Sequence, residues 1–532
     1  MYPPNFAIAP FKRPTLGPTS GILEARLQPV LGALIASVEL LRTLLKAIAH
    51  SRSSNSTGKC LNALGHLPYT LCILLKFNPK QRKQLHRPRP LLFFAVIGTL
   101  CLPWLFLLGA NGYLRHQQKL IDAEAERFFT QISTHSGNAS GQTFDALSAK
   151  IGLSPNATYS QPIFINGPNA LAFQRIESML SHFIEQQSNK VTGPLDPLPP
   201  LLQQYLVTQQ ADIDRIQAHL LTSPPPLWNM DIKQLTDASY LAPGFFNVRS
   251  VQKLLLLAVI DAHHRGQSAE VIATLDAIWQ LNQAIAQRSD LSSQVSVSVI
   301  SAQQAGLLRH LPNVPVYWQN RLVEQSHHQP VMKGVRFEAW LRYETLKAGW
   351  IPTAAPSKTA SVSEKMQTGL SNRFSFQTFF KLLSIDSAQT LHRALDQLEE
   401  LNVCTTSQAG AEAMLSDIQT AFWNSGTALS PEVMGRRWQT AGDRALSLEL
   451  SQYILQIKQQ QEKTGQWPNT VKSKRSQVCP GEQWRYQRNH DNAISISLSK
   501  QLLSPTAIPH LYRSASPSGP ASPVPVSHRH NP

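Results

Sequence analysis

The sequence predicts a mainly α-helical chain with a single transmembrane helix and a small antiparallel β element near its C-terminus. Three observations predict this fold class. Residues 91–108 carry no charged side chain. Beyond residue 171, apolar side chains recur mostly at steps of three and four, which is the period of an α-helix. Over residues 494–498 the step becomes two, the period of a strand.

The charge-free segment is long enough to cross a bilayer. It continues without charge from Leu91 to Tyr113, and at about 1.5 Å per residue it spans a hydrocarbon core of about 30 Å. The 12 Leu, Ile, Val and Phe side chains of residues 91–108 favour insertion by roughly 4 to 7 kcal/mol. Pro103 kinks such a helix but does not forbid it. The sequence therefore predicts a transmembrane helix over 91–113.

The basic excess of the chain lies before this helix. Of the net charge of +16, residues 1–90 supply +11, with 13 basic and 2 acidic residues, whereas the other 442 residues hold 36 and 31. The positive-inside rule then places 1–90 in the cytoplasm and the bulk of the chain outside a bacterial plasma (inner) membrane. A nucleic-acid-binding protein would need a folded basic domain, so we expect no nucleic-acid partner.

The cytoplasmic segment 1–90 holds two further apolar stretches. Ile22–Ala49 has helical spacing but is interrupted by four charged side chains, so we expect a helix on the membrane surface or against a partner. Leu61–Leu75 is short and contains Pro68. The sequence leaves open whether it enters the membrane.

Composition divides the rest of the chain into segments. We expect a stalk and loops over 114–170, a helical domain over 171–350, a Ser/Thr/Ala-rich linker over 351–375, a second helical region over 376–503 and a disordered Pro/Ser-rich tail over 504–532. The clearest helical unit is Val248–Ala286, where an apolar run, the turn His263–Gly266 and an amphipathic stretch follow one another. These two helices resemble one tetratricopeptide-like hairpin. No second copy is visible at a fixed period, so we predict stacked helical hairpins and not that repeat family.

Periodicity and capping residues predict the remaining helices. The expected ranges are Ala172–Ser188, Leu201–Leu221, Gln294–Leu311, Val331–Ala348, Phe376–Leu401 and Gln408–Asn424. Ser430 is a capping residue followed by Pro431, which marks the start of a long helix that runs to about Lys463.

The end of that helix has a recognisable continuation. Gln452–Lys463 leads into Thr464-Gly-Gln-Trp-Pro468, then Val478-Cys-Pro-Gly-Glu-Gln-Trp-Arg-Tyr486 and Ile494-Ser-Ile-Ser-Leu498. This order, over about residues 452–498, resembles the C-terminal part of type II secretion pseudopilins, which implies a helix packed on a small antiparallel sheet. The family's N-terminal processing site is missing, and only Asp491 lies near the place of its calcium ligands. As a whole the chain resembles uncharacterised single-pass bacterial envelope proteins with a helical domain.

Only two of the five cysteines, Cys404 and Cys479, follow the transmembrane helix. A bridge between them is feasible in an oxidising compartment. The sequence favours the alternative of two unrelated buried thiols.

No pattern in the sequence marks a catalytic, cofactor or metal site. The pairs His263-His264 and His327-His328 are the best metal candidates, but adjacent helical side chains point about 100° apart and no further ligand stands at the required spacing. We expect polar turn residues there. The tryptophans outside the membrane segment are expected to be core anchors or groove lining, among them Trp279, Trp318, Trp340 and Trp350.

A charged cluster lies on the predicted helix Val331–Ala348. It consists of Arg336, Glu338, Arg342 and Glu344. In a chain with only 15% charged residues it could line a functional groove, whereas an ion-paired helix face is the more frequent arrangement.

These features predict a non-enzymatic, membrane-anchored extracytoplasmic scaffold or binding protein of the cell envelope, in contact with the lipid bilayer and a protein partner. Two alternatives stay open. One is a hydrolase-like envelope enzyme with its site near Arg336/Glu338/Arg342/Glu344, and the other is an accessory component of a secretion or pilus system. The sequence identifies neither the partner nor the oligomeric state.

Overall fold

The computed structural model describes residues 112–113, 115–132, 136–155, 167–230, 246–324, 328–348, 376–417, 430–489, 492–500 and 510–514. The chain divides into two compact units, Met1–Gln118 and Lys119–Pro532. Almost all described residues belong to the second unit.

The predicted transmembrane helix falls outside the described residues, apart from positions 112 and 113. None of the helices in the described ranges is long and apolar enough to cross a membrane. The basic segment 1–90 and the linker 351–375 also lie outside the described residues.

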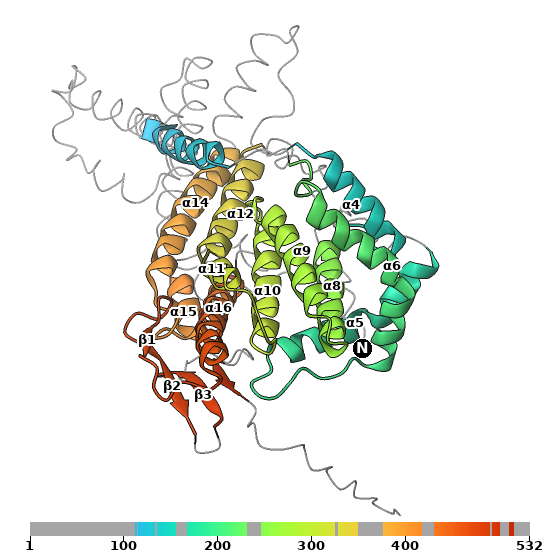
Figure 1. The fold of residues 1–532 in the computed structure, drawn as a ribbon. Coiled ribbons are helices and arrows are strands. Elements are labelled where there is room, and N and C mark those ends of the chain that lie inside the picture. The colour runs from blue at the N-terminus through green and yellow to red at the C-terminus, as the bar shows by residue number, and fades with distance from the viewer. Residues whose placement is uncertain are drawn as a thin grey trace, which may run out of the picture. The chain divides into compact units, whose positions relative to one another are not determined.

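The second unit is mainly helical and carries a small antiparallel sheet near its C-terminal end, as the sequence predicts (Figure 1). Residues 119–130 of the second unit are helical, as the C-terminal part of a helix over 115–130 that we call the first helix. The helices that follow are α4 (Ala139–Lys150), α5 (Pro168–Ser188), α6 (Pro200–Thr222), α8 (Phe246–His264), α9 (Ser268–Ala286), α10 (Leu291–Leu308), α11 (Tyr317–Glu324), α12 (His328–Ala348), α14 (Phe376–Glu400), α15 (Gln408–Asp417) and α16 (Pro431–Thr464). The strands are β1 (Lys474–Arg475), β2 (Gln483–Arg488), β3 (Ile494–Leu498) and β4 (Leu511–Arg513).

The predicted hairpin is present as α8 and α9, which pack side by side. Gly266 lies between them with a φ of +72°, a left-handed conformation that glycine adopts without steric cost. His263 and His264 belong to the last turn of α8, so the turn is shorter than the sequence suggested.

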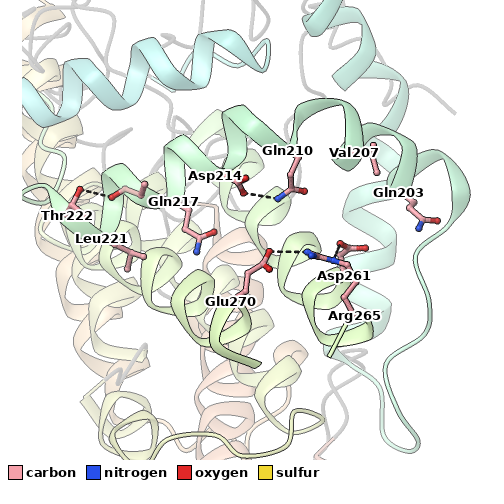
Figure 2. A pocket seen from close by; sticks show the side chains of 11 residues that line it. Gln203, Val207, Gln210, Asp214, Gln217, Leu221, Thr222, Asp261, Arg265 and Glu270 are labelled. Carbon is pink, nitrogen blue, oxygen red and sulfur yellow. Dashed lines mark hydrogen bonds and ion pairs between the residues drawn. The ribbon is translucent and has the colours of Figure 1, made fainter. Parts of the chain in front are cut away.

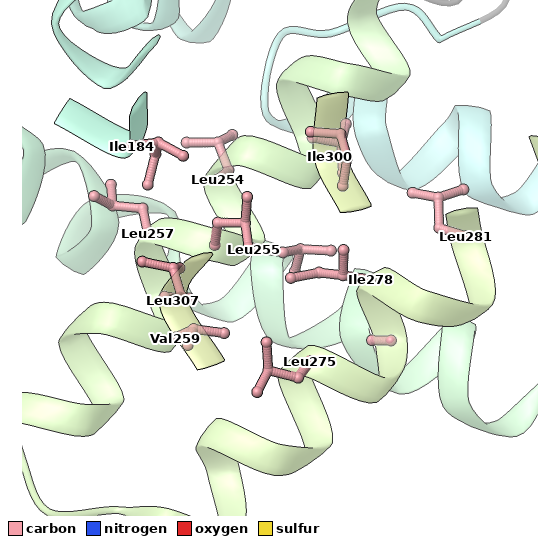
Figure 3. Packing of buried hydrophobic residues seen from close by; sticks show 14 of the residues in the cluster. Ile184, Leu254, Leu255, Leu257, Val259, Leu275, Ile278, Leu281, Ile300 and Leu307 are labelled. Carbon is pink, nitrogen blue, oxygen red and sulfur yellow. The ribbon is translucent and has the colours of Figure 1, made fainter. Parts of the chain in front are cut away.

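The larger hydrophobic core lies among α4–α6 and α8–α11 (Figure 3). Leu255 of α8, Ile278 of α9 and Leu307 of α10 are buried within it. Helix α10 packs against α5, α8, α9, α12 and α16, so it is buried nearly all round. Because nearly every face is covered, its apolar side chains do not form a single stripe.

A second core lies among α12, α14, α15, α16 and the sheet. Helix α16 begins where predicted, because the Ser430 hydroxyl accepts a hydrogen bond from the Val433 amide at 3.3 Å. It ends at Gly465, which is left-handed. Its Leu448 and Leu455 reach the first core, so α16 joins the two.

The sheet has the strand order β1-β2-β3-β4, with all neighbours antiparallel. Tyr486, Ile496 and Tyr512 are register partners across three strands and pack in the second core with α16. The helix-on-sheet arrangement implied by the pseudopilin resemblance is therefore present. The expectation of disorder from residue 504 is wrong for β4, because burial of Tyr512 and a bond from the Arg513 amide to the Val191 carbonyl (2.9 Å) hold this strand in place.

Cys404 and Cys479 form a disulfide with a Cα–Cα distance of 5.7 Å. The expectation of two unrelated thiols is thus wrong. The reason is that the segments carrying the two cysteines both pack on helix α16. Next to Cys404, Val403 packs against Gly442 of α16, and near Cys479 the Ser476 hydroxyl donates to Glu449 of the same helix at 2.6 Å. Because both segments dock on one stretch of α16, the two cysteines meet although 75 residues separate them.

Candidate binding groove

A groove with a volume of about 770 Å³ runs between α6 and the α8–α9 hairpin (Figure 2). Its lining residues are Gln203, Val207, Gln210, Asp214, Gln217, Ala218, Leu221, Thr222, Asp261, Arg265 and Glu270. We call it the α6 groove. One wall is α6, and the other is the end of α8 with the start of α9.

Helix α6 carries two parallel rows of side chains. The buried row consists of Leu202, Leu206, Gln209, Ile213, Ile216 and Leu220. The groove row is displaced by one residue and consists of Gln203, Val207, Gln210, Asp214, Gln217 and Leu221. Its alternating steps of four and three residues are the spacing at which one helix receives another, as in a coiled coil. The groove wall is therefore a straight row of mostly polar side chains.

The groove has a net negative charge. Arg265 donates to Asp261 at 2.8 Å and to Glu270 at 3.0 Å, so one guanidinium is shared by two carboxylates. The third carboxylate, Asp214, accepts a bond from the Gln210 amide at 2.8 Å. Three carboxylates thus face one cation along the lining.

Two apolar side chains of the groove row are exposed. Val207 is 73% exposed and Leu221 is 41% exposed, four helical turns apart on α6. The lining contains no His, Cys or Ser side chain. Chemically, the α6 groove suits the binding of an amphipathic segment that brings apolar and basic side chains together.

The four residues of the predicted charged cluster point to different neighbours. Arg336 of α12 pairs with Asp396 (2.6 Å) and Glu399 (3.0 Å) of α14, and Glu344 pairs with Lys347 (3.3 Å). Glu338 instead faces the start of α10, where burial raises its pKa. Burial lowers the pKa of Arg342. Two of the four residues, Arg336 and Glu344, are thus ion-paired, and the α6 groove lies elsewhere.

Of the two histidine pairs, His263-His264 lies within the described residues. In the described part of the chain, no group of three His, Cys, Asp or Glu side chains could hold a metal ion. The His264 ring nitrogen Nε2 lies 3.0 Å from the Asp196 carbonyl oxygen. His327 and the side chain of His328 fall outside the described residues.

The tryptophans act as core anchors. Trp279 and Trp318 meet edge to face at 5.9 Å, and the Arg321 guanidinium lies 5.3 Å and 4.8 Å from their ring centres. Trp340 stacks on His392 at 3.8 Å. Trp350 lies outside the described residues.

Sequence reasoning missed the groove row and two buried charges. Arg309, 1% exposed, donates from Nε to the Ser451 hydroxyl and from Nη2 to the Ser447 carbonyl, both at 2.7 Å. Burial lowers the pKa of Arg309 to about 10, so it stays charged at neutral pH. Glu449 accepts from Ser476 and from Trp484 Nε1 (3.0 Å). The only signal for the groove in the sequence is a second row at helical spacing beside the apolar row of α6.

Comparisons with known protein families, curated proteins and solved structures found no match for this chain. The geometry described above is therefore the basis for a functional interpretation.

Proposed function

We propose that this chain is a membrane-anchored, extracytoplasmic helical binding protein of the bacterial cell envelope that holds a protein partner in the α6 groove. The observation that carries the proposal is the groove itself: a mostly polar row at helix-packing spacing, with Val207 and Leu221 exposed along it, faces a wall that adds two carboxylates. Exposed apolar side chains rimmed by polar ones are typical of interaction sites.

The Cys404–Cys479 disulfide supports the extracytoplasmic part of this proposal. Disulfides persist in oxidising compartments and are rare in the cytoplasm. This argument is independent of the charge distribution around Leu91–Tyr113, which favours the same orientation. Two unrelated properties of the chain thus favour one location.

The partner segment that fits best is an amphipathic helix with Lys or Arg on its contacting face. The groove row offers the spacing for helix-in-groove packing. Asp214, Asp261 and Glu270 supply negative charge that such a helix would complement. An acidic segment would be repelled by the net negative charge of the lining, because Arg265 is its single cation beside three carboxylates.

Site-specific photo-crosslinking in cells tests the proposal. A benzoylphenylalanine in place of Val207 or Leu221 should give one discrete adduct of the same mass from both positions. The matched control is Val316, which is 62% exposed and lies outside the groove lining. Reversing the charge with Asp214→Lys and Glu270→Lys should reduce the yield of the crosslinked adduct severalfold. Identical adducts from Val316, or none from both groove positions, would overturn the proposal.

A further inference from the structure

The outer face of the four-stranded sheet is a second surface of defined chemistry. Strand register sends Trp484, Tyr486, Ile496 and Tyr512 into the second core, so the alternate residues share the opposite face. The outward residues are Arg475, Gln483, Arg485, Gln487, Ser495, Ser497, Leu511 and Arg513. We call this surface the arginine face.

Three arginines on three different strands dominate the arginine face. Arg475, Arg485 and Arg513 are all exposed. Their register partners are Gln483, Ser497 and Ser495, so no acidic side chain stands opposite them. Among the ion pairs of the described residues, none involves any of the three. The arginine face is therefore a surface of positive charge with hydroxyl and amide groups between the cations.

Register also fixes the spacing of the arginines. Arg485 lies one strand and two residues from Arg475, which is about 8 Å between Cα atoms for strands about 4.8 Å apart. Arg513 lies two strands and two residues further on, about 12 Å from Arg485. The three positions follow one diagonal of about 20 Å across the sheet. An extended peptide of about seven residues has that length and presents alternate side chains about 7 Å apart on one face.

We propose that the arginine face binds an acidic, extended segment of a partner protein, with its carboxylates along this diagonal. The guanidinium fork of Arg matches a carboxylate with two parallel hydrogen bonds. Ser495, Ser497 and Gln487 offer further donors and acceptors to the backbone of the segment. This surface is separate from the α6 groove, which is acidic and suits a basic partner.

A protein fits this face better than a lipid surface. The arginine face has no large, exposed apolar side chain for insertion between lipids, since Leu511 is half-buried. Within the second unit, the sheet packs against α16, whereas Ile121 and Ala125 of the first helix pack on Trp340 and Tyr343 of α12. In Figure 1 these two regions lie at opposite ends of the unit.

Fluorescence anisotropy with the full chain in detergent tests this inference. The probe is a labelled peptide of seven residues with Glu and Ser in alternation, and the matched peptide has Gln in place of Glu. We expect binding of the Glu peptide at low salt, no binding of the Gln peptide, and an affinity that falls as salt is raised because exposed charges are screened. Equal binding of the two peptides would overturn the inference.

Two triple variants with the same change in net charge distinguish binding at the arginine face from nonspecific electrostatic attraction to the whole chain. The sheet variant combines Arg475→Gln, Arg485→Gln and Arg513→Gln. It should reduce the affinity for the Glu peptide at least tenfold. The control replaces Arg175, Arg393 and Arg436, three exposed arginines on α5, α14 and α16, with Gln and should change the affinity less than twofold. A control that weakens binding as much as the sheet variant would contradict the inference. An unchanged thermal midpoint shows that both variants are folded.

Further binding experiments test whether the arginine face instead binds a lipid or a phosphate ligand. Vesicles of anionic phosphatidylglycerol and soluble polyphosphate should bind no better to the native chain than to the sheet variant. If either depends on the three arginines while the Glu peptide does not bind, the arginine face serves a lipid or phosphate ligand and the inference is wrong. Val207→Glu with Leu221→Glu should block the α6 groove without changing Glu-peptide binding, so the two proposals fail separately.

Discussion

The α8–α9 hairpin and the α16–sheet module are stabilised in different ways. In the hairpin, apolar side chains from helices adjacent in sequence meet across a turn at Gly266, and the first core around them is dominated by aliphatic residues (Figure 3). In the module, segments far apart in sequence dock on α16 through a disulfide and through buried polar groups such as Glu449. The hairpin is therefore a local structure, whereas the module depends on long-range contacts.

The largest expected effect falls on the module. Replacing Cys404 and Cys479 with Ala removes a crosslink that closes a loop of 75 residues, which should cost about 4 kcal/mol of the free energy of unfolding. Hydrogen exchange should show lost protection in β2 and β3 while α8 keeps its own. Replacing Cys60 and Cys72, which precede the predicted membrane helix, is the matched control and should change neither. Equal loss of protection in α8 would mean that the two regions unfold as one.

The next prediction perturbs the hairpin instead of the module, with the substitution Leu257→Ala in α8. Leu257 is fully buried in the first core, so the cavity and the lost transfer free energy should cost about 3 kcal/mol. Chemical denaturation measures the loss, with Leu201→Ala at an exposed site of α6 as the control. The same cost at both sites would contradict the packing described for the hairpin.

Acid should weaken the packing of α14 on α12 around Trp340. Burial, assisted by Arg336, lowers the pKa of His392 to about 4 against its ordinary value of 6.5, while Asp396 opposes the shift. Between these values the unfolded chain binds more protons than the folded one, so stability is complete above pH 6.5 and falls as the pH is lowered toward 4. At pH 5 the loss should be about 2 kcal/mol. His392→Phe keeps the stack on Trp340 and should flatten this part of a pH–stability curve; an unchanged slope would contradict the assignment.

The smallest expected effect tests the hairpin turn. Gly266→Ala places a side chain at a φ of +72°, where no neighbouring atom obstructs it but the backbone conformation costs about 1 kcal/mol. The thermal midpoint should fall by a few degrees. A gain in stability would mean that the turn does not need a left-handed residue.

Local signals explain which elements could be predicted from the sequence. Ser430-Pro431 and Gly465 cap α16 with groups within one turn of its ends, so both boundaries were predictable. The disulfide was not, since Cys404 and Cys479 meet only because α16 receives the segments that carry them. Strand β4 escaped prediction for the same reason, because the burial of Tyr512 depends on its register with Ile496.

The candidate site was the hardest part to predict. The groove row of α6 is largely Gln and Asp, so it looks like an ordinary solvated helix face. Its opposite wall comes from residues 261–270, and only the packing of α6 against α9 brings the two together. The charged cluster of α12 was conspicuous in the sequence, yet Arg336 pairs with α14 and Glu344 with Lys347 of its own helix.

The most direct test of the proposed function asks on which side of the membrane the second unit lies. Cys404 and Cys479 are buried, so the test uses an exposed position: Cys60, Cys72 and Cys101 are replaced by Ala, and Val316, which is 62% exposed, is replaced by Cys (Val316→Cys). Intact spheroplasts are then treated with a membrane-impermeant maleimide. We expect labelling at position 316 without lysis of the cells, because the second unit lies outside the membrane. Labelling that requires lysis would place the unit in the cytoplasm and contradict the proposal.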